Sequence, residues 1–169
     1  MLFFAVAVLA RPQHSAAMEP SLQIRPAQKS DVGQISRLVQ KTIRISNAQD
    51  YPKAVIDRVV ANFSTDTVQH LLTIRTVLVA IQDDVAVGTA SLDGEVVRTV
   101  FVAPEVQGQG VGRCLMNAIE AIADQEGTTV LQVPASLTAR PFYARLGYIE
   151  VRDVLHGEER TVIMEKRIG

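Results

Sequence analysis

A glycine-rich segment has the residue types and spacing best suited to binding a ligand. It reads Gln107-Gly108-Gln109-Gly110-Val111-Gly112 and follows a strand-like run over 96–102. Apolar residues then recur every three to four positions from Val111 to Ile122, which predicts a helix. Glycine allows positive φ and close approach of a ligand, and the first N–H groups of a helix have no helical partner. We therefore expect phosphate oxygens to bind here; the alternative is a turn that only packs a helix on a sheet.

Two common phosphate-binding loops do not fit this segment. A Walker A loop has lysine and then serine or threonine after its last glycine, whereas Gly112 is followed by Arg113 and Cys114. A Rossmann loop needs a further glycine at position 113 and an acidic residue at the end of the next strand. The next strand-like run, 129–133, ends in Pro134-Ala135-Ser136. The remaining pattern, Gln-x-x-Gly-x-Gly, resembles the pyrophosphate loop of the GNAT superfamily of acyl-CoA-dependent N-acyltransferases.

A second segment, 136–148, is similar to a later motif of the same superfamily. Its sequence Ser136-Leu137-Thr138-Ala139-Arg140-Pro141-Phe142-Tyr143-Ala144-Arg145-Leu146-Gly147-Tyr148 predicts a short helix that carries Phe-Tyr and ends at a Gly-aromatic pair. Ser136 is suited to capping this helix, and Gly147 to the left-handed position that ends it. The resemblance implies that Tyr143 is the general acid; a tyrosine that packs its ring and hydrates its hydroxyl is the alternative.

The resemblance also implies the cosubstrate and the groups that bind it. The cosubstrate would be acetyl-CoA, which donates its acetyl group to a primary amine of a small molecule or peptide within a ternary complex. Backbone groups of Phe101 and Val102 and the side chain of Ser136 would bind the pantetheine arm. The pyrophosphate would bind the loop residues Gln107, Gly108, Gln109, Gly110, Val111 and Gly112. His14, His70 and His156 show no metal-ligand spacing, so we expect no metal.

The general base and the acceptor site are less well defined. Some superfamily members place a glutamate where this chain has Val96; Glu95 is adjacent, but strand alternation would turn it to the other face unless a bulge intervenes. Gln132 lies near a second acidic position, so water-mediated deprotonation is an equal alternative. Asp50 and Tyr51 lie in a polar break that, by the resemblance, borders the acceptor site, where Asp50 would attract a cationic amine and Tyr51 would stack on it; an ordinary loop is the alternative that we favour.

A different class of function also fits these features. The chain would then be a non-catalytic acyl-CoA-binding module that acts as a sensor or scaffold. Tyr143 favours the enzyme, whereas the absence of an acidic residue at Val96 is consistent with the non-catalytic binding module. Arg140 and Arg145 are candidates for contacts with CoA phosphates, although exposed helix arginines are usually only solvated.

The pattern of elements predicts the GNAT fold, an α/β (α+β) single domain with a central mixed, splayed sheet of about six to seven strands flanked by helices. Strands are expected at 21–26, 76–82 and 85–92, with turns at Asp83-Asp84 and Asp93-Gly94. Helices are expected at 30–47, around 55–63 and around 68–72. The glycine segment is followed by helix, strand, short helix, a strand from Tyr148 and a last strand at about 160–165.

Composition agrees with one cytoplasmic domain. The chain has 169 residues, 47% of them hydrophobic, which suits one sizeable core. Its net charge of −1 and lack of basic runs argue against a nucleic-acid partner, and its apolar start is too short to span a membrane. Cys114, the single cysteine, is expected to be a buried structural thiol. We interpret 1–18 as a non-core extension, either a leader or a start placed too early, and 19–169 as the domain; a homodimer is a further expectation.

Overall fold

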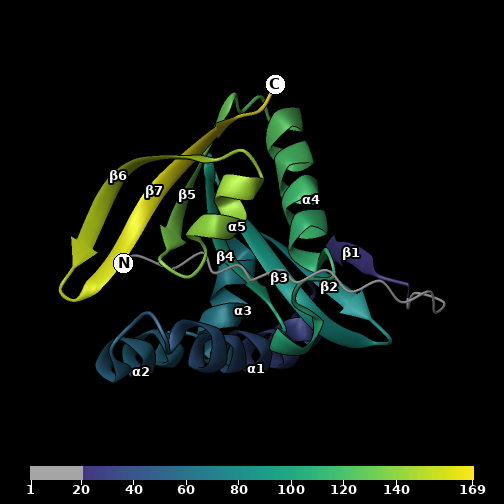
Figure 1. Cartoon of the computed structure of the whole chain (residues 1–169). Coiled ribbons are helices and arrows are strands. Elements are labelled where there is room, and N and C mark those ends of the chain that lie inside the picture. The colour runs from purple at the N-terminus through teal and green to yellow at the C-terminus, as the bar shows by residue number, and fades with distance from the viewer. Residues whose placement is uncertain (1–20) are drawn as a thin grey trace.

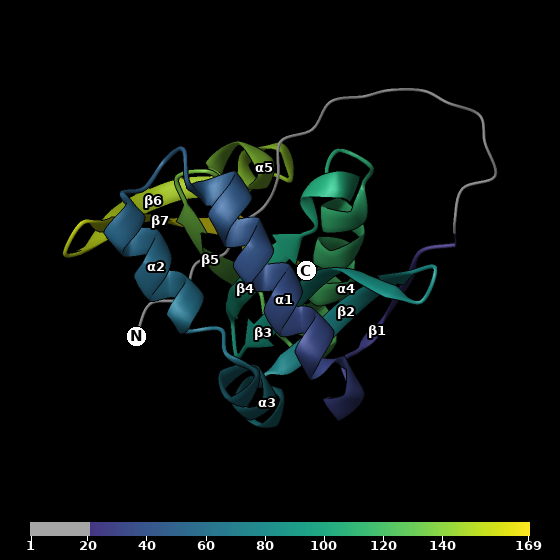
Figure 2. The ribbon, with the colours of Figure 1, turned by 90° about the horizontal axis from the view of Figure 1, so that it is seen from below.

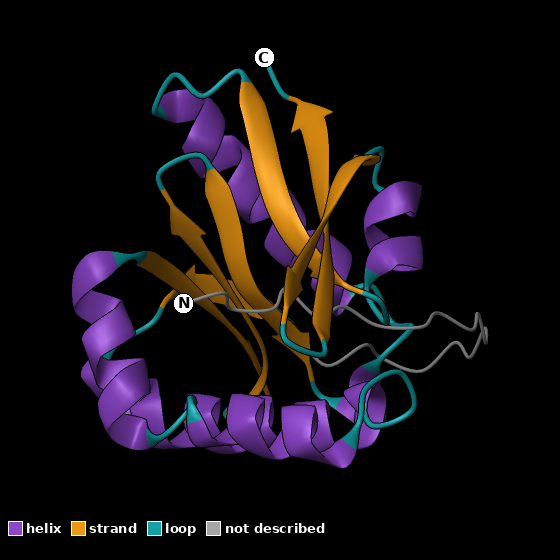
Figure 3. Cartoon of the chain, turned by 90° about the vertical axis from the view of Figure 1, so that its left-hand side faces the viewer, coloured by secondary structure: helices purple, strands orange, loops and turns teal. Residues whose placement is uncertain are grey.

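A mixed sheet of seven strands organises the part of the chain that the structure describes, residues 21–169. In this computed structural model the strands lie in the order β1-β2-β3-β4-β5-β7-β6, with helices on both sides (Figures 1 and 3). The predicted sheet and its flanking helices are confirmed. The expected extension at 1–18 falls outside the described residues.

The strands divide into two antiparallel groups joined by one parallel pair. The first group is β1 Gln23–Pro26, β2 Thr76–Gln82, β3 Val85–Asp93 and β4 Val96–Val102. The second group is β5 Val130–Ser136, β6 Ile149–His156 and β7 Glu159–Arg167. Asp83 and Asp84 form the β2–β3 turn with φ of 51° and 62°, and Gly94 with φ of 60° lies in the β3–β4 turn, so both predicted hairpins are confirmed.

Within residues 21–169, five α-helices cover the two faces of the sheet. One face carries α1 Val32–Thr42, α2 Lys53–Ala61 and α3 Thr65–Ile74, and the other carries α4 Val111–Gln125 and α5 Arg140–Arg145 (Figure 2). The single helix expected over 30–47 is divided into a 3₁₀ turn at Lys29–Asp31, α1, and a π-helical turn at Ile43–Asn47. Such π turns often occur at functional sites, and this one carries Ser46 and Asn47.

Helix α4 connects the two groups of strands and packs tightly on the sheet. Leu115, Met116 and Ile119 are completely buried, and each such side chain contributes about 1.5–3 kcal/mol to folding. An added Cβ on Gly88 of β3 would come within 2.9 Å of Leu115, so glycine is what allows this close approach. Cys114 lies on the exposed side of the helix, and the prediction of a buried structural thiol is therefore wrong.

The sheet opens between β4 and β5. The two strands pair in register only at Val96 and Gln132, next to a 2.9 Å hydrogen bond from Gln132 N to Glu95 O. Beyond this point β4 runs without a ladder to β5, as expected for a splayed sheet. A bulge at Thr99, which has φ of 43°, shifts the pairing of β4 with β3. As a result, Val100 and Val102 join the core under α4, whereas Phe101 joins the core under α1–α3.

Candidate functional site

The glycine loop has the backbone geometry that its sequence predicts. Gly108 and Gly110 have φ of 79° and 89°, and Gly110 is the N-cap of α4. The first helical bond of this turn runs from Cys114 N to Gly110 O, and no side chain caps the helix start. The N–H groups at the start of α4 are therefore available to an anion, and the positive end of the helix dipole faces the same space.

Gly112 has a different role from the two glycines before it. A Cβ added there would come within 3.0 Å of the Phe142 ring, so the first turn of α4 packs directly against α5. The loop that would bind phosphate and the helix that carries Tyr143 are thus joined by a contact that leaves no room for a larger residue.

A cleft lies between these two helices. It encloses about 230 Å³ and is lined by Val102, Val106, Gly108, Gly110, Val111, Gly112, Arg113, Phe142, Arg145 and Leu146. Arg113 and Arg145 are exposed, and among residues 21–169 neither forms an ion pair. The cleft thus combines helix N–H groups, two cations and apolar walls, which suits a ligand with phosphate groups and an apolar arm. Arg140 does not line the cleft and instead pairs with Glu150 at 2.8 Å.

Gln107 anchors the loop to its surroundings. Its Nε2 donates to Ser46 Oγ at 3.0 Å and to Val102 O at 3.1 Å. These bonds tie the loop to the π turn after α1 and to the end of β4. The Gln107 side chain therefore positions the loop, while Gln109 is exposed at its tip.

Phe101 and Val102 differ in where their backbone groups point. Val102 is paired with Gly88, and Ala103 N donates to Val87 O at 2.8 Å. In an antiparallel ladder this pattern directs the N–H and C=O of Phe101 to β3 and those of Val102 to the other side, where β5 has separated. The prediction of a pantetheine contact therefore does not hold for Phe101, whose ring is fully buried against Phe63 at 5.7 Å. Val102 keeps its N–H as a candidate donor.

The backbone of Tyr143 is hydrogen-bonded at both ends, since its N–H donates to Ala139 O at 3.2 Å and its carbonyl belongs to the C-terminal cap of α5. Tyr148 N donates to Tyr143 O at 3.0 Å and Gly147 N to Ala144 O at 3.1 Å, which is a Schellman motif with Gly147 at φ of 94°. The predicted C-terminal glycine is thus confirmed. Ser136 ends β5, and its Oγ accepts from Ala139 N at 3.1 Å, so it caps the turn before α5 and not α5 itself.

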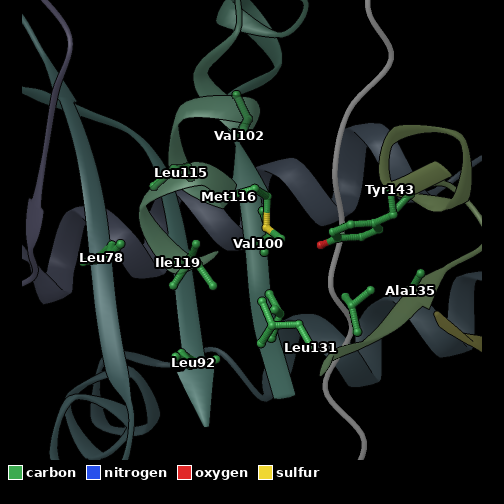
Figure 4. Close-up of a cluster of buried hydrophobic side chains, with 14 of the residues drawn as sticks. Leu78, Leu92, Val100, Val102, Leu115, Met116, Ile119, Leu131, Ala135 and Tyr143 are labelled. Atoms are coloured by element: carbon green, nitrogen blue, oxygen red, sulfur yellow. The ribbon is translucent and has the colours of Figure 1, made fainter. Parts of the chain in front are cut away.

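The Tyr143 hydroxyl is the least expected polar group of the site. The side chain is completely buried, and within the described residues its oxygen has no hydrogen-bond partner. Figure 4 shows the hydroxyl directed toward Val100 of β4. Burial raises the pKa of Tyr143 well above its usual range, so the hydroxyl stays protonated. A buried donor without an acceptor in the open part of the sheet is suited to a ligand atom that accepts a hydrogen bond.

Asp50 and Tyr51 lie where β5 ends, but Tyr51 does not have its expected role. Tyr51 is 6% exposed; its hydroxyl donates to Arg160 O at 2.7 Å and accepts from Leu137 N at 2.8 Å. Tyr51 therefore joins the π-turn region to β5 and β7, and its ring is not free to stack on an acceptor. Asp50 is exposed and accepts a 2.6 Å bond from Thr138 Oγ1.

The candidate bases are not at the open end of the sheet. Glu95 is exposed in the turn before β4, at the opposite end of the strand from the glycine loop, about 20 Å away at the usual rise per residue. Gln132 donates to Glu165 Oε1 at 2.9 Å. Among the described residues, no cluster of three or more histidine, cysteine or acidic side chains is placed to bind a metal, and no helix is long and apolar enough to cross a membrane.

Comparison with known proteins gives matches of one family and fold. Residues 47–166 match the family model described as acetyltransferase (GNAT) domain. A search among curated proteins gave no match. A solved structure from Rhodopseudomonas palustris, named GCN5-related N-acetyltransferase: aminotransferase, class-II, is 27% identical with a TM-score of 0.82, covering 92% of this chain and 99% of its own.

Two solved structures with bound cofactor share the fold. The PaiA N-acetyltransferase of Thermoplasma acidophilum in complex with coenzyme A is 17% identical, with a TM-score of 0.76, covering 87% of this chain and 99% of its own. YncA of Salmonella typhimurium, a putative acetyltransferase solved with acetyl-CoA, is 20% identical with a TM-score of 0.62, covering 88% of this chain and 95% of its own.

Proposed function

This chain belongs to the GNAT acetyltransferase family, and from that premise we propose that it transfers an acetyl group from acetyl-CoA directly to a primary amine of a small molecule or peptide. The observation that carries the proposal is the Tyr143 hydroxyl, a fully buried donor without a partner in the described residues, beside the open part of the sheet. An unpartnered buried hydroxyl destabilises the free protein, so its presence supports a hydrogen bond to the bound cosubstrate, which in the proposed reaction is made to the leaving sulfur.

The cleft supports acetyl-CoA as the cosubstrate. The N–H groups at the start of α4 would hold the pyrophosphate, with Arg113 and Arg145 adding positive charge. The N–H of Val102 and the hydroxyl of Ser136 would bind the pantetheine arm along the strand edge that β5 leaves open. Two structural neighbours with the same fold were solved with coenzyme A or acetyl-CoA. Because acetyl-CoA is a cytoplasmic metabolite, we propose that the reaction takes place in the cytoplasm.

Tyr143 would act on the leaving sulfur. Acetyl-CoA supplies a thioester, whose C–S bond breaks as the N–C bond forms; the nitrogen loses a proton and the sulfur gains one. The Tyr143 hydroxyl would donate a hydrogen bond to the sulfur as negative charge develops there. Because burial raises the pKa of Tyr143, transfer of its proton would come late and be coupled to the loss of the proton from nitrogen.

Water is the better candidate for taking the proton from nitrogen. Val96 has no acid–base chemistry, Glu95 is remote from the open end of the sheet, and Gln132 is not an acid. Attack requires a neutral amine, so a water chain from the open face of the sheet would carry the proton to bulk solvent. No covalent acyl-enzyme is required.

The test is a release assay for free CoA thiol, run with acetyl-CoA over a broad panel of amines. Thiol release that depends on an amine, with an equal amount of acetylated product, is the expected result. Tight binding of acetyl-CoA without release of CoA thiol for any amine would favour a sensor or scaffold and overturn the proposal that the chain is an enzyme.

A further inference from the structure

Three buried side-chain oxygens lack a hydrogen-bond partner among the described residues on the α1–α2 side of the sheet. They are Asn47 Oδ1, Glu159 Oε1 and Thr161 Oγ1, on residues that are 2%, 5% and 1% exposed. Buried polar atoms of this kind are rare in folded proteins, because an oxygen removed from water needs another donor. Three together therefore need an explanation.

The three oxygens come from distant parts of the chain that meet at the carboxyl end of β5. The Tyr51 hydroxyl joins Leu137, just after β5, to Arg160, which lies between Glu159 and Thr161 on β7. Asn47, one turn before Tyr51, donates from Nδ2 to Thr138 Oγ1 at 3.4 Å. The three residues are thus linked to the same strand end.

Strand alternation fixes the direction of the two side chains on β7. Val162 and Met164 belong to the core under α4, so Thr161 and Glu159 point to the other face, toward α2. Thr161 is paired with Ser136 across β5 and β7, and Glu159 Oε2 accepts a 3.0 Å bond from Arg58 of α2. Glu159 Oε1 and Thr161 Oγ1 are therefore directed to the side where Asn47 and Tyr51 lie.

The charge and hydrogen-bond character of this group indicate its ligand. Glu159 has one ion pair, with Arg58, while nearby Asp50 has none among the described residues and Arg160 is paired with Asp153 at 2.6 Å. Two of the unpartnered atoms can only accept, and the third is a hydroxyl. A primary ammonium has three donors, no acceptor and a positive charge, so it complements this group of acceptors and the carboxylate of Asp50, whereas an anionic ligand does not.

We propose that the acceptor carries a second ammonium group besides the amine that is acetylated, and that Asn47, Asp50, Glu159 and Thr161 bind it. The acceptor would thus be a diamine or a longer polyamine. This inference rests on the proposed acetyl transfer, because Thr161 is paired with Ser136, which would contact the pantetheine arm in that reaction. One nitrogen stays charged in the oxygen cluster while the other, uncharged, attacks the thioester.

The experiment compares α,ω-diaminoalkanes of increasing length, each beside the n-alkylamine of the same length. Wild type should use at least one diamine with a kcat/KM roughly ten- to a hundredfold above its monoamine, the range that hydrogen bonds to a charged group supply. Glu159→Gln should bring this ratio close to one. Glu158→Gln, at the exposed neighbouring position, is the matched control and should keep the ratio.

Thr161→Val protects the test against a simple folding defect. It keeps the shape of the side chain and removes an oxygen without a partner, so the melting temperature should stay equal or rise while the diamine kcat/KM falls. Equal use of diamines and monoamines by wild type, or an equal loss for both in Glu159→Gln and Thr161→Val, overturns the inference and leaves acetyl transfer standing.

A calorimetric titration of the diamines without acetyl-CoA separates this inference from the proposed function. If no amine releases CoA thiol but a diamine binds wild type and not Glu159→Gln, the enzyme proposal fails and the ammonium site stands. If no diamine binds and none is preferred in turnover, the ammonium site fails.

Discussion

Replacing Tyr143 with phenylalanine removes one buried oxygen and keeps the ring in place. The ring lies edge-on to Phe142 at 5.1 Å and to Tyr148 at 5.6 Å between centroids, and phenylalanine keeps both contacts. The hydroxyl is fully buried and has no partner among the described residues. Its removal should therefore raise the stability of the fold and lower the rate of turnover.

The magnitude for folding follows from that missing partner. Burying a hydroxyl without a hydrogen bond costs about 1–3 kcal/mol, so Tyr143→Phe should raise the free energy of unfolding by about 1–2 kcal/mol. In a domain of this size each kcal/mol raises the melting temperature by roughly 2–4 °C. Urea titration and thermal melts of the protein without acetyl-CoA measure this effect.

The magnitude for turnover follows from the proposed role in protonating the sulfur. A positioned general acid contributes on the order of 10² to 10⁴ in rate, and the low end is expected because a thiolate, with a thiol pKa of about 8.5, is already a fair leaving group. The loss should appear in kcat and not in the KM for acetyl-CoA, since the hydrogen bond matters mainly in the transition state.

Tyr148→Phe is the matched control, because its neighbouring hydroxyl is partnered. Tyr148 donates to Glu120 Oε1 at 3.0 Å, so this change should lower stability by about 1–3 kcal/mol and leave kcat near wild type. Equal kcat for Tyr143→Phe and wild type, with the chemical step shown to limit the rate, would remove Tyr143 from the mechanism. Lower stability of Tyr143→Phe would show that its hydroxyl is bonded in the free protein.

Three further changes probe the loop, the cleft and the fold. Gly110→Val should weaken acetyl-CoA binding at least tenfold but cost only about 1–2 kcal/mol of stability. The cost is small because nothing lies within 4 Å of the added Cβ, so the only strain comes from φ of 89°. Calorimetry measures the affinity and urea titration the stability, and an intact affinity would refute the phosphate-binding role of the loop. Arg113→Gln with Arg145→Gln should raise the KM for acetyl-CoA several-fold, reduce its dependence on salt and spare kcat; unchanged salt dependence would contradict the cleft assignment. Asp31→Asn should cost about 1–3 kcal/mol at neutral pH, since hydrogen bonding from Arg25 lowers the pKa of Asp31. A depressed folded pKa stabilises the protein above the unfolded value near 3.9, so the deficit should shrink as the pH of a urea titration falls through and below that value; a constant deficit would contradict the ionic origin.

The glycine loop and the end of the tyrosine helix were predictable because their signals are local. Gly108, Gly110 and Gly147 need positive φ, a property that glycine supplies wherever it occurs in the chain. The hairpins at Asp83-Asp84 and Gly94 are local in the same sense. Each depends on a few adjacent residues, so sequence reasoning needs no knowledge of distant partners.

The errors arise where distant segments decide the outcome. Phe101 was expected to bind pantetheine, but pairing with β3 directs its backbone away from the opening, and the bulge at Thr99 turns its ring into the core under α1–α3. Tyr51 was expected to stack on an acceptor, but its hydroxyl bonds to Arg160, 109 residues away. No sequence pattern predicted a functional role for Glu159, because its place near the end of β5 comes only from the pairing of β7 with β5.

Gly112 links the two halves of the proposed mechanism. Its missing side chain lets the Phe142 ring rest on the first turn of α4, and Phe142 directly precedes Tyr143 on α5. The loop that would bind pyrophosphate and the helix that carries the hydroxyl proposed to protonate the sulfur are therefore in direct contact. A methyl group at Gly112 would press against the ring at 3.0 Å and displace α5, so it should impair kcat as well as acetyl-CoA affinity. A change at Gly110 touches nothing on α5 and should impair affinity alone, which makes the two glycines separable although both lie in one loop.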